Sequence, residues 1–183
     1  LDKKILKRII EPTLRGLKDL GTSFKGFLYA GLMIVENEPY LIEYNVRMGD
    51  PECQTILPRI KTDFIDIILA CVNRHLDLLN LEWFDEKSIC IVLCSKGYPD
   101  EYKNNVEIKA LNQIKLQDDN YIFHAGTKIS NSIIYSNGGR VLNFVITSKN
   151  LKKSRDQAIN LINNLNWSNG YYRKDIGYKI IKK

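Results

Sequence analysis

Hydrophobic residues recur at helical spacing near the start of the chain and form strand-like runs soon after. Residues 3–20 carry apolar side chains at every third or fourth position and are followed by Gly21, which favours a helix that ends there. The apolar runs 27–35 and 40–46 flank the turn-forming segment 36–39, a pattern typical of a β-hairpin. We therefore predict a helix followed by a hairpin.

Two short helices are expected next. Asp50 is a favourable N-cap residue, and Pro51 suits the first helical position, where its missing N–H costs nothing. Pro58 disturbs this helix, and Asp63 can cap a second one whose apolar residues follow at helical spacing. The segment 77–87 has mixed polarity and is interpreted as a connector.

From residue 88 onward the pattern is mostly that of strands. The runs with strand character are residues 88–94, 106–111, 121–125, 132–135 and 140–147. Asn137-Gly138-Gly139 marks a tight turn between the last two, and residues 151–165 form an amphipathic helix. We therefore predict an α+β fold, with one domain at residues 1–87 and a mostly antiparallel β subdomain with a packed helix at residues 88–183.

Composition places the chain among globular proteins. Its 183 residues are 44% hydrophobic, which is enough for a core. No apolar run approaches the roughly 20 residues of a membrane-spanning helix, and the charged start is unlike a secretory signal, so a cytoplasmic protein is expected. The net charge of +6 is compatible with nucleic-acid binding or with a bias toward Lys, Ile and Asn. Scattered lysines without interleaved exposed aromatics favour the bias.

The chain begins at Leu1 and enters a helical pattern at once, so we expect the C-terminal part of something longer. If Lys183 is the true end, nothing is fused downstream. The four cysteines lack the paired spacing of a zinc site and are expected to be reduced thiols.

The strand around residues 40–46 carries the candidate chemistry. Glu43, Asn45 and Arg47 occupy alternate positions, which places them on one strand face. Carboxylate and amide oxygens are hard ligands of the kind Mg²⁺ accepts, and a guanidinium holds phosphate oxygens by paired hydrogen bonds. Phosphoryl transfer relies on this combination, although the same spacing is also typical of a solvated sheet surface.

Two further expectations follow from this segment. Gly49 permits a sharp chain reversal, and the helix start at Asp50 and Pro51 directs backbone N–H groups toward the end of the strand, where an anion could bind. The residues of the opposite strand face are expected in the core: Tyr40, Ile42, Tyr44 and Val46.

At these residues the chain resembles a known family. The E-x-N-x-R strand and the R-x-G-D-P-E motif at residues 47–52 are similar to the end of the ATP-grasp domain of the glycinamide ribonucleotide synthetases, or phosphoribosylamine–glycine ligases. Further similar motifs follow in the family's order: Tyr29–Met33, Gly97–Pro99, Phe123–Thr127, Gly138–Leu142 and Tyr172–Gly177. The resemblance covers roughly residues 26–177.

The resemblance implies the C-terminal part of an ATP-grasp domain followed by the family's C-terminal subdomain. It implies an ATP-dependent ligase of purine biosynthesis that joins glycine to 5-phosphoribosylamine through glycyl phosphate. It also implies small-molecule substrates, Mg²⁺ or Mn²⁺, and ATP as co-substrate. Neither nucleic acid nor a membrane is expected as a partner, and a monomer is expected.

Roles are carried over by matching residues to the family's motifs. Glu43 and Asn45 would hold the metal, and Arg47 would be the catalytic group that stabilises the transferring phosphoryl. The expected substrate-binding residues are Arg47, Gly49, Asp50 and Pro51. Met33 would pack on the adenine of the nucleotide, with an ordinary core methionine as the alternative.

The chain also departs from the family pattern. Gly31 stands where many ATP-grasp enzymes carry an additional acidic metal ligand. The resemblance also implies that the family's N-terminal domain and the half of ATP-grasp that covers the nucleotide are absent, so the chain alone is expected to be inactive. Another ATP-grasp carboxylate–amine ligase and a non-catalytic binding fragment remain alternatives. His124 is expected to be structural, with a catalytic role as the alternative, and Arg173 and Asp175 form either a structural pair or a contact to a substrate phosphate.

Overall fold

The computed structural model describes residues 1–118 and 120–181, which divide into two compact units. Unit 1 contains residues 1–50 and 61–82, and unit 2 contains residues 51–60 and the chain from Trp83 onward. Both units combine helices with antiparallel strands, so the predicted α+β class is confirmed. The predicted boundary between residues 87 and 88 stays a proposal, because neither compact unit is continuous in sequence.

Unit 1 begins with the predicted helix. Its segments are α1 (Asp2–Ile5), the π-helical turn η1 (Leu6–Ile10) and α2 (Glu11–Asp19). The π-turn ends at Ile10, two residues before Pro12, whose missing N–H interrupts the regular α-helical hydrogen bonding. Gly21 has a φ of +80°, its N–H donates to the Lys18 carbonyl, and the Thr22 N–H donates to the Leu17 carbonyl. This is a Schellman ending, and the role predicted for Gly21 is confirmed.

The predicted hairpin follows and is also confirmed. Strands β1 (Tyr29–Val35) and β2 (Glu38–Asn45) pair antiparallel as a two-stranded sheet. Glu36 and Asn37 in the turn both have positive φ, 49° and 63°, which matches the twist of the flanking strands. Gly31 pairs with Glu43 and Leu32 pairs with Leu41, so Ile42 is one residue in excess and creates a β-bulge.

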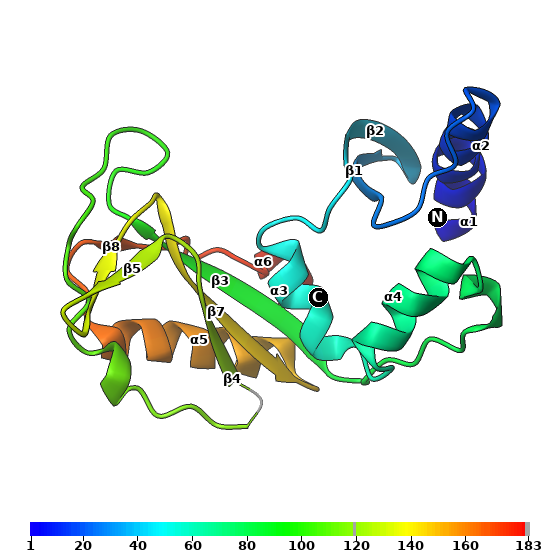
Figure 1. The fold of residues 1–183 in the computed structure, drawn as a ribbon. Coiled ribbons are helices and arrows are strands. Elements are labelled where there is room, and N and C mark those ends of the chain that lie inside the picture. Colours follow the sequence, from blue (N-terminus) through cyan, green and yellow to red (C-terminus); the bar gives the residue numbers. More distant parts are fainter. Residues whose placement is uncertain (119, 182–183) are drawn as a thin grey trace. The chain divides into compact units, whose positions relative to one another are not determined.

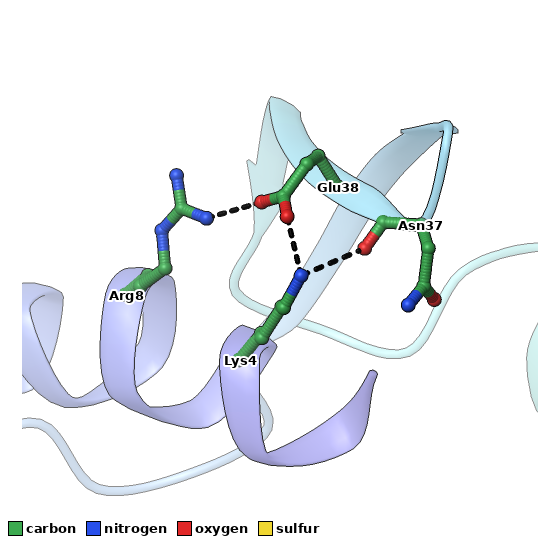
Figure 2. Close-up of polar contacts among 4 residues, drawn as sticks. All are labelled: Lys4, Arg8, Asn37 and Glu38. Atoms are coloured by element: carbon green, nitrogen blue, oxygen red, sulfur yellow. Dashed lines mark hydrogen bonds and ion pairs between the residues drawn. The ribbon is translucent and has the colours of Figure 1, made fainter.

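Polar contacts tie the hairpin to the first helix. Figure 2 shows the Glu38 carboxylate accepting hydrogen bonds from Lys4 and Arg8, while Lys4 Nζ also donates to the Asn37 carbonyl at 3.4 Å. The hydrogen bonds from Lys4 and then Arg8 hold the pKa of Glu38 below its ordinary value of 4.5. The hairpin turn is therefore fastened to the helix by an ionised carboxylate.

We expect Glu38→Gln to lower the thermal unfolding midpoint at pH 7 and to have little effect in acid. A carboxylate with a lowered folded-state pKa stabilises the protein above its unfolded-state pKa and loses that contribution as the pH falls through the folded value. The gap between the melting curves of the parent and the variant should therefore close below about pH 4.5. Glu101→Gln, at an exposed loop position, is the control. A gap that is unchanged at pH 2.5 would contradict this assignment.

The predicted core face of β2 is wrong for three of its four residues. Tyr40, Ile42 and Val46 are 56%, 66% and 73% exposed, because the hairpin has no further strand or layer over them. Tyr44 is half-buried, and its hydroxyl lies 2.5 Å from the Thr13 hydroxyl on α2.

Helix α4 (Phe64–Asn73) completes the regular helices of unit 1 and is followed by the short 3₁₀ turn η3 (Leu76–Leu78). The Asp63 carboxylate accepts a hydrogen bond of 2.7 Å from the Ile65 N–H, so the predicted N-cap is confirmed. The helix ends at Arg74, which has a φ of +61°. Phe64 stacks on Phe27 with ring centroids 5.9 Å apart.

Unit 2 is built on a four-stranded antiparallel sheet in the order β4-β7-β3-β8. These strands are β3 (Lys87–Ser95), β4 (Asn120–His124), β7 (Arg140–Ser148) and β8 (Gly170–Tyr171). Helix α5 (Leu151–Leu165) lies along one face of this sheet (Figure 1), and its N-cap is Asn150. The buried core between them includes Ile91, Leu93, Leu142, Phe144, Ile146, Ala158 and Ile162. Strands β3, β4 and β7 and helix α5 confirm the sequence prediction.

Shorter elements complete unit 2. They are α3 (Glu52–Ile56), the 3₁₀ turns η2 (Leu57–Arg59) and η4 (Leu111–Gln113), the hairpin of β5 (Thr127–Ser130) and β6 (Ile133–Ser136), and α6 (Tyr178–Ile181). The prediction of a strand at residues 106–111 is wrong. This segment forms only an isolated β-bridge, between Glu107 and Tyr135. The chain then turns, so that Ile108 and Leu111 are both buried although they are three residues apart. Within the described ranges, no helix has the length and apolar character that a membrane span requires.

Candidate active site

The hairpin of unit 1 positions the residues proposed to bind a metal. Glu43 lies directly opposite Gly31, and Asn45 lies opposite Tyr29, so these four residues share one face of the two-stranded sheet. A Cβ atom added at Gly31 would lie 3.0 Å from Cγ of Glu43. The absence of a side chain at Gly31 therefore leaves space that the Glu43 side chain occupies.

Glu43 and Asn45 are in direct contact. The Asn45 side-chain amide donates a hydrogen bond of 3.2 Å to Glu43 Oε1. Glu43 is exposed and Asn45 is half-buried, so both are accessible from outside unit 1 rather than enclosed beneath apolar groups. The structure thus brings together the acid and the amide that the sequence predicted on one face.

The oxygen atoms of Glu43 and Asn45 suit a hard divalent cation that takes its other ligands from phosphates and water. Turning the Asn45 amide would bring its oxygen beside the Glu43 carboxylate, and Mg²⁺ commonly binds through one or two protein oxygens together with phosphates and water. No cluster of three or more His, Cys, Asp or Glu residues suited to a metal occurs among the residues described. The pair fits a metal shared with a nucleotide better than a site built entirely by the protein.

Arg47 lies beyond the end of β2 rather than on the strand face. Strand β2 ends at Asn45, and the guanidinium of Arg47 donates a hydrogen bond of 2.9 Å to the carbonyl of the neighbouring Met48. The side chain is exposed. Of the three residues predicted on one strand face, only Glu43 and Asn45 lie on the strand. Arg47 lies on the irregular segment that follows β2.

The segment after Arg47 differs in part from the prediction. Asp50 is the last residue of the first stretch of unit 1, and Pro51 is the first residue of unit 2. Helix α3 begins at Glu52 with Pro51 at the N-cap position, so the predictions of Asp50 as N-cap and Pro51 as first helical residue are wrong. Proline has no side-chain acceptor for a cap, and the helix is only five residues long. Gly49, also predicted to contact substrate, is buried.

Because of the β-bulge, Tyr40 lies on the strand face of Glu43 and Asn45, whereas the sequence pattern placed it on the opposite face. Met33 pairs with Tyr40, and the extra residue Ile42 shifts the alternation so that Tyr40 lies on the face of Glu43 and Asn45. Met33 and Tyr40 are 55% and 56% exposed. An exposed apolar pair therefore adjoins the polar pair. Only the register, which strict alternation does not reveal, could have located Tyr40.

Unit 2 holds the remaining candidates. His124 is exposed, and its Nδ1 lies 2.9 Å from the Thr127 hydroxyl, a local contact that supports the structural role expected for it. Arg173 donates two hydrogen bonds to Asp175, at 3.0 and 2.7 Å. These bonds hold the pKa of Asp175 below its ordinary range and raise the pKa of Arg173. The predicted pair is therefore present.

A cavity of about 450 Å³ in unit 2 was not foreseen from the sequence. Its lining is mainly apolar and aromatic and includes Pro51, Tyr98, Tyr172 and Arg173. Tyr172 is held by a hydrogen bond of 3.0 Å to the Asn163 side chain. The cysteines at positions 90 and 94 also line it, and none of the four cysteines of the chain forms a disulfide, in agreement with the prediction of reduced thiols.

Comparison with protein families identifies relatives of both parts of the chain. Residues 88–179 match the family model described as the C domain of phosphoribosylglycinamide synthetase. Residues 1–53 match the model described as the ATP-grasp (A) domain of the same enzyme. The first of these matches alone covers half of the chain.

Individual proteins agree with these matches. The chain is 38% identical over 180 residues to the phosphoribosylamine–glycine ligase of Brucella melitensis, covering 98% of this chain and 42% of that protein. It is 42% identical over 180 residues to the ligase of Caldanaerobacter subterraneus, covering 96% of this chain and 42% of the relative. The crystal structure of the Thermotoga maritima ligase matches with a TM-score of 0.79 and 32% identity, over 94% of this chain and 42% of that one.

The chain thus spans less than half the length of these relatives. Its similarity to each of them nevertheless extends over nearly all of its own residues, in both sequence and structure. The chain belongs to the phosphoribosylglycinamide synthetase family.

Proposed function

We propose that this chain forms the C-terminal part of an ATP-dependent phosphoribosylamine–glycine ligase, and that its first 53 residues are the end of the ATP-grasp domain. The contact between Glu43 and Asn45 on an accessible strand face is the observation that carries the proposal. It is supported by the family to which the chain belongs. The same proposal includes a cytoplasmic, monomeric enzyme of purine biosynthesis.

The reaction proposed has two steps. A carboxylate oxygen of glycine attacks the γ-phosphorus of ATP, the bond to the bridging oxygen of ADP breaks, and glycyl phosphate and ADP result. The amine nitrogen of 5-phosphoribosylamine then attacks the carbonyl carbon of glycyl phosphate. The carbon–oxygen bond to phosphate breaks, the nitrogen loses a proton, and glycinamide ribonucleotide and inorganic phosphate are released.

Glu43 and Asn45 would hold the divalent ion, Mg²⁺ or Mn²⁺, through the carboxylate and the amide oxygen. The bound ion supplies positive charge that neutralises the β- and γ-phosphate oxygens. Gly31 leaves the Glu43 carboxylate room on the accessible face. Met33, exposed on that same face, packs against the adenine.

Arg47 stabilises the negative charge that develops on the transferring phosphoryl group and on the acyl phosphate. Its position just beyond the strand, on an irregular segment, lets the side chain leave the Met48 carbonyl and turn toward a phosphate. Gly49, Asp50 and Pro51 continue this segment and shape the loop that contacts the substrates. Asp50 is the group that would accept a hydrogen bond from a substrate ammonium or hydroxyl.

The test is an assay of ADP formation by a complete ligase polypeptide that contains these residues. ADP release should require glycine and 5-phosphoribosylamine together with ATP. Arg47→Ala should lower kcat/KM by about 100- to 1,000-fold, the usual effect of removing one group that stabilises transition-state charge. Arg15→Ala, an exposed arginine on α2, should leave activity unchanged. Full activity of the Arg47 variant, or ADP release without glycine, would contradict the proposal.

A further inference from the structure

A cavity of about 490 Å³ lies between the first helix and the end of α4 in unit 1. Ile10 and Leu14 line it from the first helix, and Cys71 and Leu76 line it from α4 and η3. All of its lining residues belong to unit 1, so one compact unit forms the cavity by itself. A cavity of this volume is large enough for a small organic ligand.

The segment 23–28 connects the two sides of this cavity and also lines it. Phe27 stacks on Phe64 of α4 with ring centroids 5.9 Å apart. Lys25 Nζ donates a hydrogen bond of 2.7 Å to the Val72 carbonyl near the end of the same helix. Contacts within unit 1 therefore hold this wall of the cavity in place.

Positive charge is concentrated around the cavity. Lys18, Lys25 and Arg74 line it, and Asp77 carries the only carboxylate among the described residues of the lining. Within unit 1, all of which the structure describes, neither Lys18 nor Arg74 forms an ion pair. Like charges that are held close together repel one another, so the three cations and one carboxylate leave two positive charges without compensation. An anion in the cavity would supply that compensation.

The backbone at Arg74 places one of these cations. Arg74 ends α4 with a φ of +61°, and its N–H donates to the Cys71 carbonyl at 3.3 Å. Glycine is the usual residue in this left-handed conformation at the end of a helix, because a side chain makes the conformation unfavourable. Arginine occupies the position here, and its side chain lines the cavity.

We propose that this cavity binds a small phosphate monoester that carries an aromatic group. A phosphate monoester has a charge of about −1.5 to −2 at pH 7, which matches the two uncompensated positive charges better than a carboxylate does. The guanidinium of Arg74 can donate to two phosphate oxygens at once. Each lysine ammonium has three N–H donors, so Lys25 can contact the phosphate while it keeps its bond to the Val72 carbonyl.

The apolar part of the lining accounts for the aromatic group of the ligand. Leu14, Phe24 and Leu28 line the cavity together with the cations, and an aromatic ring can pack against the phenyl ring and the two aliphatic side chains. The Asp77 carboxylate can accept a hydrogen bond from a hydroxyl or amino group of the ligand. Inorganic phosphate makes none of the apolar contacts and is expected to bind more weakly.

The cavity is separate from the proposed metal site. Tyr44 lies on the strand face opposite Glu43 and Asn45, and its hydroxyl is 2.5 Å from the Thr13 hydroxyl on α2. The helix that lines the cavity therefore packs on the hairpin face that does not carry the metal pair. The inference consequently does not depend on the proposed ligase activity.

Isothermal titration calorimetry of the 183-residue chain with 1-naphthyl phosphate tests the proposal. The ester should bind at least tenfold more tightly than 1-naphthol, which lacks the anion, and than inorganic phosphate, which lacks the ring. 1-Naphthoate, which carries a single negative charge, should bind more weakly than the ester. Absence of binding at about 1 mM ester, the weak end of specific affinities, would overturn the inference. Equal affinities for the ester and any of the three comparison compounds would do the same.

Substitutions of the lining cations provide the second measurement. Arg74→Asn should weaken binding of the ester at least tenfold, because it removes the guanidinium while asparagine tolerates the left-handed backbone. Lys18→Gln should weaken it as well. Arg15→Gln is the matched control, since Arg15 is exposed on the same helix as Lys18 but does not line the cavity. Unchanged affinity of the Arg74 variant, or an equal loss in the Arg15 variant, would contradict the site.

The cysteines of the chain locate the bound ligand. Cys71 lines the cavity, whereas Cys53, Cys90 and Cys94 belong to unit 2. Alkylation by iodoacetamide, followed by site-resolved mass spectrometry, should proceed at least fivefold more slowly at Cys71 when 1-naphthyl phosphate is saturating. The other three cysteines should react at unchanged rates. An unchanged rate at Cys71, or protection of Cys90 and Cys94 in the cavity of unit 2, would overturn the inference.

Discussion

Glu43→Ala is expected to lower kcat/KM for ATP by at least about 100-fold in a complete ligase that contains this chain, because it removes the charged member of a two-residue metal site. The carboxylate is exposed, so the loss should come from metal and phosphate binding rather than from unfolding. The concentration of Mg²⁺ or Mn²⁺ needed for half-maximal activity should rise as well. ADP release measured across a range of metal concentrations tests both expectations.

The control for this prediction is Asp85→Ala, which removes an exposed carboxylate from a loop of unit 2. It should change neither the rate nor the requirement for metal. Thermal unfolding midpoints of both variants should match that of the parent protein. If the Glu43 variant kept its activity and its metal dependence, the metal-binding role proposed for Glu43 would be wrong.

The largest effect on stability is expected from Phe144→Ala in unit 2. Phe144 is fully buried on β7, directly opposite Ile91 on β3 and Ile122 on β4. Removing a fully buried phenylalanine side chain typically costs about 3–5 kcal/mol, because both the transfer free energy and the packing around the cavity are lost. Chemical denaturation of unit 2, followed by the fluorescence of its two tryptophans, should show this loss in the free energy of unfolding.

Ile129→Ala provides the comparison for Phe144→Ala. Ile129 lies on β5 and is 74% exposed, so its substitution should change the free energy of unfolding by less than about 0.5 kcal/mol. Equal effects of the two substitutions would mean that the sheet and α5 are not packed as described.

Local features of the fold were predictable because they depend on neighbouring residues. Gly21 ends the first helix, Asp63 caps α4, and the turn at Glu36 and Asn37 forms the hairpin, each through contacts within a few residues. The amphipathic pattern of α5 was also sufficient, because one face of that helix is covered by the sheet of unit 2. These predictions needed no knowledge of distant segments.

The predictions that failed depended on distant partners. The bulge at Ile42 arises from the pairing of β2 with β1, so the alternation of β2 alone put Tyr40 on the wrong face. The apolar residues of β2 were expected in a core, but unit 1 has no layer over them. The segment 106–111 has strand-like composition, yet it is bridged to β6 at a single residue before it turns into η4.

The candidate site was predictable in part for the same reason. Glu43 and Asn45 share a face because they are two residues apart in a strand and lie on the same side of the bulge. Arg47 follows the last strand residue, where alternation no longer determines direction. The start of α3 also depends on the passage into unit 2, so the caps proposed at Asp50 and Pro51 could not be derived from capping preferences alone.

The chain passes between its two compact units three times, after residues 50, 60 and 82. A single backbone cleavage therefore cannot separate the two units, because a cut after residue 50 leaves residues 61–82 of unit 1 joined to unit 2, and a cut after residue 82 leaves residues 51–60 of unit 2 joined to unit 1. Expressing the chain from residue 83 onward would likewise omit α3 and η2, which belong to unit 2. A protease that nicks this protein once yields fragments that each contain an incomplete unit, and a truncation series designed on family domain boundaries will divide unit 2 as well.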